Sequence, residues 1–154
     1  MARDLPNSVV VPAALAGVAV AATVVTLEFG VLFFSEPEPS SQLWILPAFW
    51  IGALTVFLMG FIIVGIPAWI VADYLGRRHW YDAVLIGALL TGAAEFLWAF
   101  SGIQSSSSVG GVDLIVDGRY TAPGWIYVFK MAAAIGVGGA AAGLTIWWMA
   151  YRKR

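Results

Sequence analysis

Four long apolar runs constrain this chain more than any other feature. They cover about residues 9–34, 43–72, 83–100 and 125–149. Each is close to or above the roughly 20 residues that an α-helix needs to cross the hydrocarbon core of a bilayer. A backbone in lipid must satisfy its own hydrogen bonds, so apolar runs of this length are expected to be helical. The sequence predicts an all-α integral membrane protein, with a four-helix transmembrane bundle forming a single domain over residues 1–154.

Composition narrows the chemistry of this bundle. Hydrophobic residues make up 61% of the chain and charged residues only 11%, too few to cover a water-soluble globule. The net charge of -1 provides no basic surface for nucleic acid. The chain has no cysteine and a single histidine, His79, which excludes thiol chemistry and any metal site with several histidines. We therefore expect neither a cofactor nor a metal, and we predict that the protein is not an enzyme.

The basic residues predict how the spans are oriented. Six of them fall on one side of the four runs, namely Arg3, Arg77, Arg78, Arg152, Lys153 and Arg154. The other side carries Arg119 alone. Because cytoplasmic loops are rich in Lys and Arg, both termini are expected in the cytoplasm. The abundance of Ala and Gly without cysteine is typical of a bacterial protein, so we expect a multi-pass protein of the bacterial inner membrane.

The loop over residues 101–124 is the longest connection, and it is expected on the outer side. It begins with a Ser/Gly segment that we expect to be flexible. Beyond it, VDLIV and RYT flank Asp117 and Gly118, a dipeptide that favours a type I′ turn. A short β-hairpin is therefore predicted at about residues 112–122. It either forms a simple connection or provides a docking surface for another protein on the outer side.

Small residues predict which spans pack closely. Lipid offers no hydrophobic force between helices, so close approach depends on Gly and Ala. The first, third and fourth spans carry such residues at helical spacing: Gly17, Ala21, Ala88, Gly92, Gly139 and Gly143. The second span is bulkier, and we expect it to face lipid or a partner protein. Pro67 is expected to bend this span near its end.

Three ionisable residues fall inside the spans: Glu28, Glu95 and Lys130. Counted inward at about 1.5 Å per residue, each lies roughly 10 Å below the outer end of its helix. Charges in lipid are costly, so we predict a Glu28–Lys130–Glu95 cluster, with Thr91 and Tyr127 as supporting hydrogen-bonding groups. Two interpretations stay open. The cluster is either a structural clamp that sets the register of three helices, or a proton or cation site.

Two weaker predictions concern the turn between the second and third spans. Asp73 and Arg77 are four residues apart and would form an ordinary surface pair on a continuing helix. His79 is expected to be a loop residue at the membrane interface.

These features favour a small non-enzymatic membrane protein, an accessory, assembly or scaffold subunit whose partner docks on the second span or the outer hairpin. The alternative is a proton-coupled small-solute transporter, or an ion-conducting bundle, that uses Glu28, Glu95 and Lys130. The expected partners are membrane lipids and another membrane protein or a second copy of the chain, but not nucleic acid.

Overall fold

The computed structural model describes residues 7–33, 45–101, 106–109 and 111–152. Within these ranges it contains four helical segments that are long and apolar enough to cross a membrane, as the sequence predicts. Three are single helices and the second is interrupted by a π-helical turn. Their bounds are α1 Asn7–Phe33, α2 Ile45–Gly60 continued by η1 Phe61–Gly65 and α3 Ile66–Tyr74, α4 Trp80–Phe100, and α5 Ala122–Tyr151. The segment α2-η1-α3 is called the second span below.

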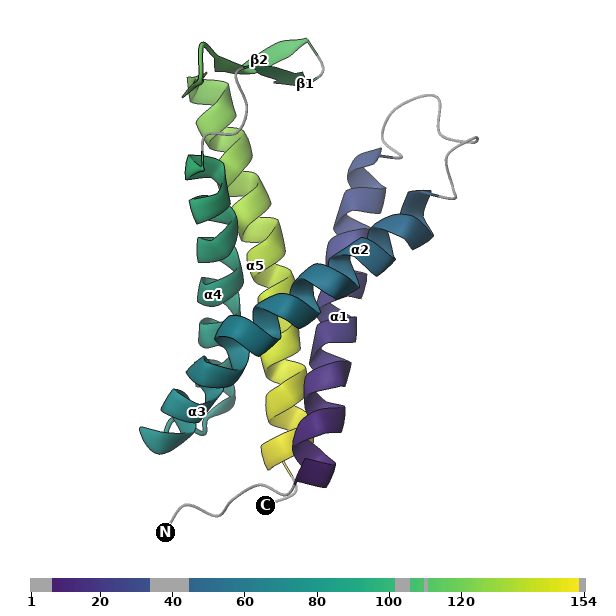
Figure 1. Cartoon of the computed structure of the whole chain (residues 1–154), viewed down its shortest axis with the longest axis vertical. Helices are drawn as coiled ribbons and strands as arrows, with labels where there is room; N and C mark the ends of the chain where they lie inside the picture. Colours follow the sequence, from purple (N-terminus) through teal and green to yellow (C-terminus); the bar gives the residue numbers. More distant parts are fainter. Residues whose placement is uncertain (1–6, 34–44, 102–105, 110, 153–154) are drawn as a thin grey trace.

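Helix α5 occupies the centre of the bundle, with α4 along one side and α1 along the other (Figure 1). The second span crosses these helices obliquely. The start of α1, the end of α5 and the turn between α3 and α4 lie at one end of the molecule, which we call the terminal end. A small sheet lies at the opposite end, called the hairpin end.

Backbone contacts between small residues hold α4 and α1 against α5. A Cβ atom added to Gly143 would overlap the carbonyl oxygen of Ala83 on α4. On the other side, a Cβ added to Gly17 of α1 would lie 2.6 Å from Cγ1 of Ile146 and 3.1 Å from the carbonyl oxygen of Ala142. Only glycine permits helices to approach so closely, which is how small residues hold transmembrane helices together.

The second span packs loosely and carries a π-helical turn where the sequence predicts a bend. The amide of Ile66 donates to the carbonyl of Phe61, five residues back, and Pro67 follows at the start of α3. Because proline has no N–H and clashes with the preceding turn, a wider turn placed just before it relieves the clash. No residue of α2 or η1 is buried. Helix α2 rests on α1 through Phe49, whose ring centroid lies 4.5 Å from that of Phe29.

The small sheet has three antiparallel strands in the order β1-β2-β3, with bounds β1 Ser107–Val109, β2 Val112–Val116 and β3 Arg119–Tyr120. Asp117 and Gly118 join β2 to β3 with φ values of 49° and 72°. Two positive φ values define the predicted type I′ turn. The prediction of a flexible Ser/Gly segment was wrong for residues 107–109, because the backbone of β1 pairs with β2 in spite of its weak strand propensity.

The sheet is seated on the start of α5. Leu114 and Ile115 are buried, and the amide of Thr121 donates to the carbonyl of Leu114. The Thr121 hydroxyl accepts from the amide of Gly124 and so caps the helix. The Tyr120 hydroxyl donates to the carbonyl of Ala99 near the end of α4, at 3.0 Å. The sheet therefore ties α4 and α5 together at the hairpin end.

Candidate functional site: a cavity beneath the second span

A cavity of about 890 Å³ separates the second span from the bundle. Its walls come from α1, the second span, α4 and α5. It extends from Arg77 and Tyr151 at the terminal end to Glu95 and Trp98 toward the hairpin end. The cavity exists because the second span crosses α5 at an angle and touches its neighbours mainly through α1 and through η1 against α4.

The walls of this cavity are apolar and rich in aromatic rings, including Phe57, Phe61 and Trp69 of the second span. Gly52 and Gly60 also line it, and a Cβ added at either would meet nothing within 4 Å. These two glycines therefore differ from those of α5, which press against neighbouring backbones. The face of the second span that lines the cavity is therefore not packed against another helix at these two glycines.

Glu95 is the one carboxylate that lines the cavity within the described part of the chain. The two ion pairs found there involve Asp73 and Asp82, so Glu95 has no basic partner among the described residues. The predicted supporting group Thr91 does not bond to it. Its hydroxyl donates instead to the carbonyl of Gly87, at 2.9 Å, and of Ile135, at 3.2 Å.

Glu28 approaches α5 from the opposite side. One of its carboxylate oxygens, Oε2, is buried without a hydrogen-bond partner. Gly17 of α1 lies against Ala142, and Ala21 lies against Gly138. A step of four residues forward along α1 therefore corresponds to a step of four residues back along α5. Glu28 follows Ala21 by seven residues, so it lies at the same height along the bundle as residue 131.

Lys130 lies at the same height along the bundle as Glu28 and Glu95, but its side chain points away from them. Gly87 faces Gly139 across the α4–α5 contact, and the same counting brings Glu95 level with Met131, next to Lys130. However, Lys130 and Gly139 are nine positions apart, which at 100° per residue places them about 180° apart around α5. The Lys130 side chain is accordingly exposed. No ion pair joins it to Glu28 or Glu95, all three of which the structure describes.

The Lys130 side chain does not point inward as predicted. The prediction failed because α5 carries small residues on every side, so their spacing does not identify its inward face. Lys130 shares a face with Ala134 and Ala141, which suggested an inward position. The inward face is instead marked by glycines, whose contacts involve backbone atoms. Lys130 and the predicted supporting residue Tyr127 both line a separate surface pocket of about 460 Å³ beneath the sheet.

All six predicted packing residues lie at helix contacts. Gly17 and Ala21 face α5 from α1. Ala88 and Gly92 face it from α4, where Ala88 lies against Gly136 and Gly92 against Ala132. Gly139 and Gly143 complete the α5 side of the contact with α4. Sequence reasoning missed Gly87, which lies opposite Gly139 and has no partner at GxxxG spacing in its own helix.

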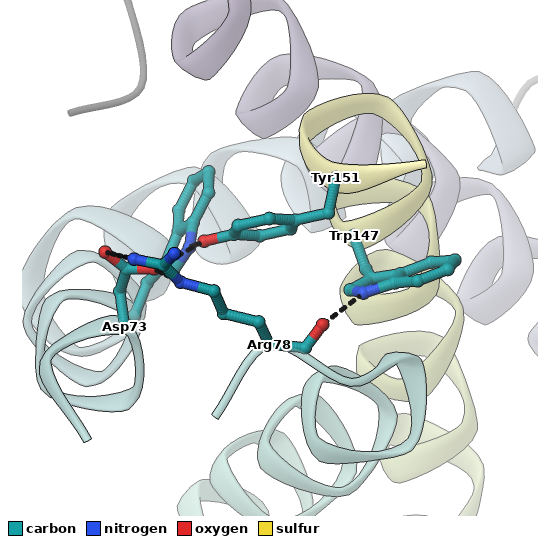
Figure 2. A network of polar contacts seen from close by, with 5 residues as sticks. Asp73, Arg78, Trp147 and Tyr151 are labelled. Atoms are coloured by element: carbon teal, nitrogen blue, oxygen red, sulfur yellow. Dashed lines mark hydrogen bonds and ion pairs between the residues drawn. The ribbon is translucent and has the colours of Figure 1, made fainter. Parts of the chain in front are cut away.

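A polar network lies at the terminal end of the bundle (Figure 2), and its members Trp69, Trp147 and Tyr151 also line the cavity. Arg78 forms a bidentate pair with Asp73, with Nε 2.7 Å from Oδ1 and Nη2 3.2 Å from Oδ2. Tyr151 donates to Asp73 at 3.2 Å and accepts from Trp69 Nε1 at 2.9 Å. The hydrogen bond and charge of Asp73 raise the pKa of the Arg78 guanidinium above its ordinary value. Trp147 Nε1 donates to the carbonyl of Arg78 at 2.8 Å, which fixes the turn to α5.

The predicted pair of Asp73 with Arg77 was wrong. Arg77 instead pairs with Asp82 of α4, with Nη1 3.2 Å from Oδ1. The helix ends at Tyr74 and the chain turns at Gly76, whose φ is 72°, so helical spacing no longer applies at Arg77. Asp82 is buried, and sequence reasoning missed its role because it depends on the path of this turn. His79 lies in the connection before α4, as expected, with its ring stacked on Tyr81 at 5.0 Å.

The described residues contain no group of three or more His, Asp or Glu that could hold a metal ion. No protein-family model, curated protein or solved structure matches the chain.

Proposed function

We propose that this protein is a non-enzymatic membrane subunit that assembles with another transmembrane protein along its second span. The observation that carries the proposal is the poor packing of that span. It is as long as α5, yet α2 and η1 contribute no buried residue. A helix with so few contacts to the rest of its own chain gains little stability from those contacts. A neighbouring protein would supply the missing packing.

The face for such a partner is an apolar ridge that points away from the cavity. We call it the outer ridge, and it consists of Ile51, Met59, Ile62, Ile66 and Ile70. All five side chains are exposed and none lines the cavity. Residues three, four or eight positions apart lie on the same side of a helix. These five side chains therefore form a ridge that can pack into the groove of a second helix.

Site-specific photocrosslinking in the native membrane tests this proposal. A photoreactive amino acid at Met59 of the outer ridge should yield a discrete adduct with one other protein. The matched control is Val137, which is exposed on α5 and does not line the cavity beneath the second span. Adducts of equal yield at both positions, or lipid adducts alone, would argue against a partner on the second span.

A second candidate function is a proton-coupled small-solute transporter or ion-conducting bundle, supported by the presence of Glu95 in the cavity wall. An acid inside a span commonly marks a proton or ion pathway. In this candidate function, Glu28 and Glu95 approach α5 from two sides at the same height along the helix. Lys130 would contribute its charge to the pathway from the outer surface of the bundle. Proton-dependent solute flux in vesicles containing the purified protein alone would favour this candidate.

A further inference from the structure

The size of the cavity suits a small molecule. Ligand sites in proteins typically enclose about 300–1,000 Å³ and combine apolar walls with a few polar groups. The cavity beneath the second span has about 890 Å³ and is walled largely by apolar and aromatic side chains. Gly52 and Gly60 leave open space on its second-span side. The cavity is therefore roomy enough for a ligand with a bulky apolar body.

The charges around the cavity favour a cation. At the terminal end, the ion pair with Asp82 compensates the positive charge of Arg77, so Arg77 adds no net positive charge to the cavity. Toward the hairpin end, Glu95 has no basic partner among the described residues. Lys130, the lysine inside the membrane spans, points away from the cavity. A bound cation would stabilise the ionised form of the Glu95 carboxyl group, whereas an anion would find no unpaired basic group among the described residues of the cavity wall.

The aromatic rings of the cavity favour the same ligand. Trp98 follows Glu95 by three residues, so both lie on the same side of α4 and both line the cavity. The second span adds the rings of Phe57, Phe61 and Trp69 to the cavity wall, with Trp69 at the terminal end. The faces of aromatic rings attract cations, and most strongly away from water. A carboxylate combined with these rings is suited to a positively charged, largely apolar molecule.

We propose that the cavity beneath the second span binds a lipophilic monocation, with the positive charge beside Glu95 and the apolar body among the aromatic rings. This inference does not depend on the partner protein proposed above, because the outer ridge lies on the other side of the second span.

Binding of radiolabelled tetraphenylphosphonium to the purified full-length chain in lipid nanodiscs tests the proposal. The wild-type protein should show a saturable site, and Glu95→Gln should weaken binding about tenfold or more, as expected for the loss of a charge-assisted contact. Glu28→Gln is the matched control and should leave the affinity nearly unchanged, because Glu28 does not line the cavity. Tetraphenylborate, which has the same shape and the opposite charge, should not displace the phosphonium.

A second measurement covers the case in which Glu95→Gln fails to fold. The chain has no cysteine, so single substitutions can be alkylated selectively. Both Ala93 and Ala94 are exposed, but only Ala94 lines the cavity. Alkylation of an Ala94→Cys variant should abolish phosphonium binding, and alkylation of an Ala93→Cys variant should preserve it. Equal affinity in wild type and Glu95→Gln, equal displacement by the borate, or binding that survives alkylation at position 94 would each overturn the proposal.

Discussion

Gly139 of α5 and Gly87 of α4 lie face to face, and a Cβ atom added to either would overlap the carbonyl oxygen of the other. Like the contact of Gly143 with Ala83, it brings the backbones of α4 and α5 close together. It also fixes the relative register of α4 and α5, and with it the level at which Glu95 and Lys130 lie. The stability of the fold should therefore depend on this position.

Gly139→Ala is expected to destabilise the protein, because the added methyl group can be accommodated only if the two backbones separate. Overpacking of this kind typically costs about 1–3 kcal/mol. The matched control is Gly52→Ala on the second span, where a Cβ would meet nothing within 4 Å. Since alanine is the better helix former, the control should be neutral or slightly stabilising. Thermal unfolding in detergent compares the two variants, and equal melting temperatures would contradict the packing described for α4 and α5.

Tyr151→Phe should weaken the terminal end. It removes the acceptor for Trp69 and one donor to Asp73, and a typical hydrogen bond contributes about 0.5–1.5 kcal/mol. Tyr127→Phe is the control, because Tyr127 is exposed and none of the hydrogen bonds described here involves it. The free energy of unfolding of both variants should be measured under the same conditions. A larger loss for Tyr127→Phe would show that the network in Figure 2 does not form.

Lys130→Met distinguishes the predicted clamp from the observed exposed position. If Lys130 held Glu28 and Glu95 together, its removal would leave two uncompensated acids and cost several kcal/mol. Since its side chain is exposed and outside the cavity, we expect a change within about 0.5 kcal/mol. The readout is the melting temperature together with the elution profile on size exclusion. A collapse of the folded peak would restore the clamp interpretation.

Impermeant maleimide labelling in intact cells tests the orientation, which is so far a prediction from the basic residues. A Val116→Cys variant places a thiol on the exposed face of the sheet, and a Tyr74→Cys variant places one at the terminal end. The cysteine-free background makes each label specific. We expect reaction at position 116 in intact cells and at position 74 only after permeabilisation. The reverse pattern would place the terminal end outside.

Much of the fold is predictable from the sequence, because length and hydropathy determine a membrane span almost regardless of its neighbours. The type I′ turn is also local, since Asp117 and Gly118 determine it between them. Strand β1 was missed because Ser107 and Ser108 are held by pairing with β2 and not by their own propensity. A pairing of this kind depends on the path of the chain.

The candidate site was predictable only in part. Glu28, Glu95 and Lys130 share a layer, as counting along the helices indicates, but their directions depend on helix rotation. In α5, alanine and glycine occur on every side, so spacing alone did not identify the inward face. The cavity could not be predicted, because it results from the crossing angle of the second span, which a stripe of bulky apolar residues does not encode.

The mass of the assembly extracted from its native membrane in mild detergent tests the central claim most directly. Native mass spectrometry should show the chain in complex with a second, different polypeptide, and substitution of Met59 by a charged residue should release the chain from it. A chain that appears only as a monomer or homo-oligomer, and that catalyses proton-dependent solute flux by itself, would contradict the assembly function.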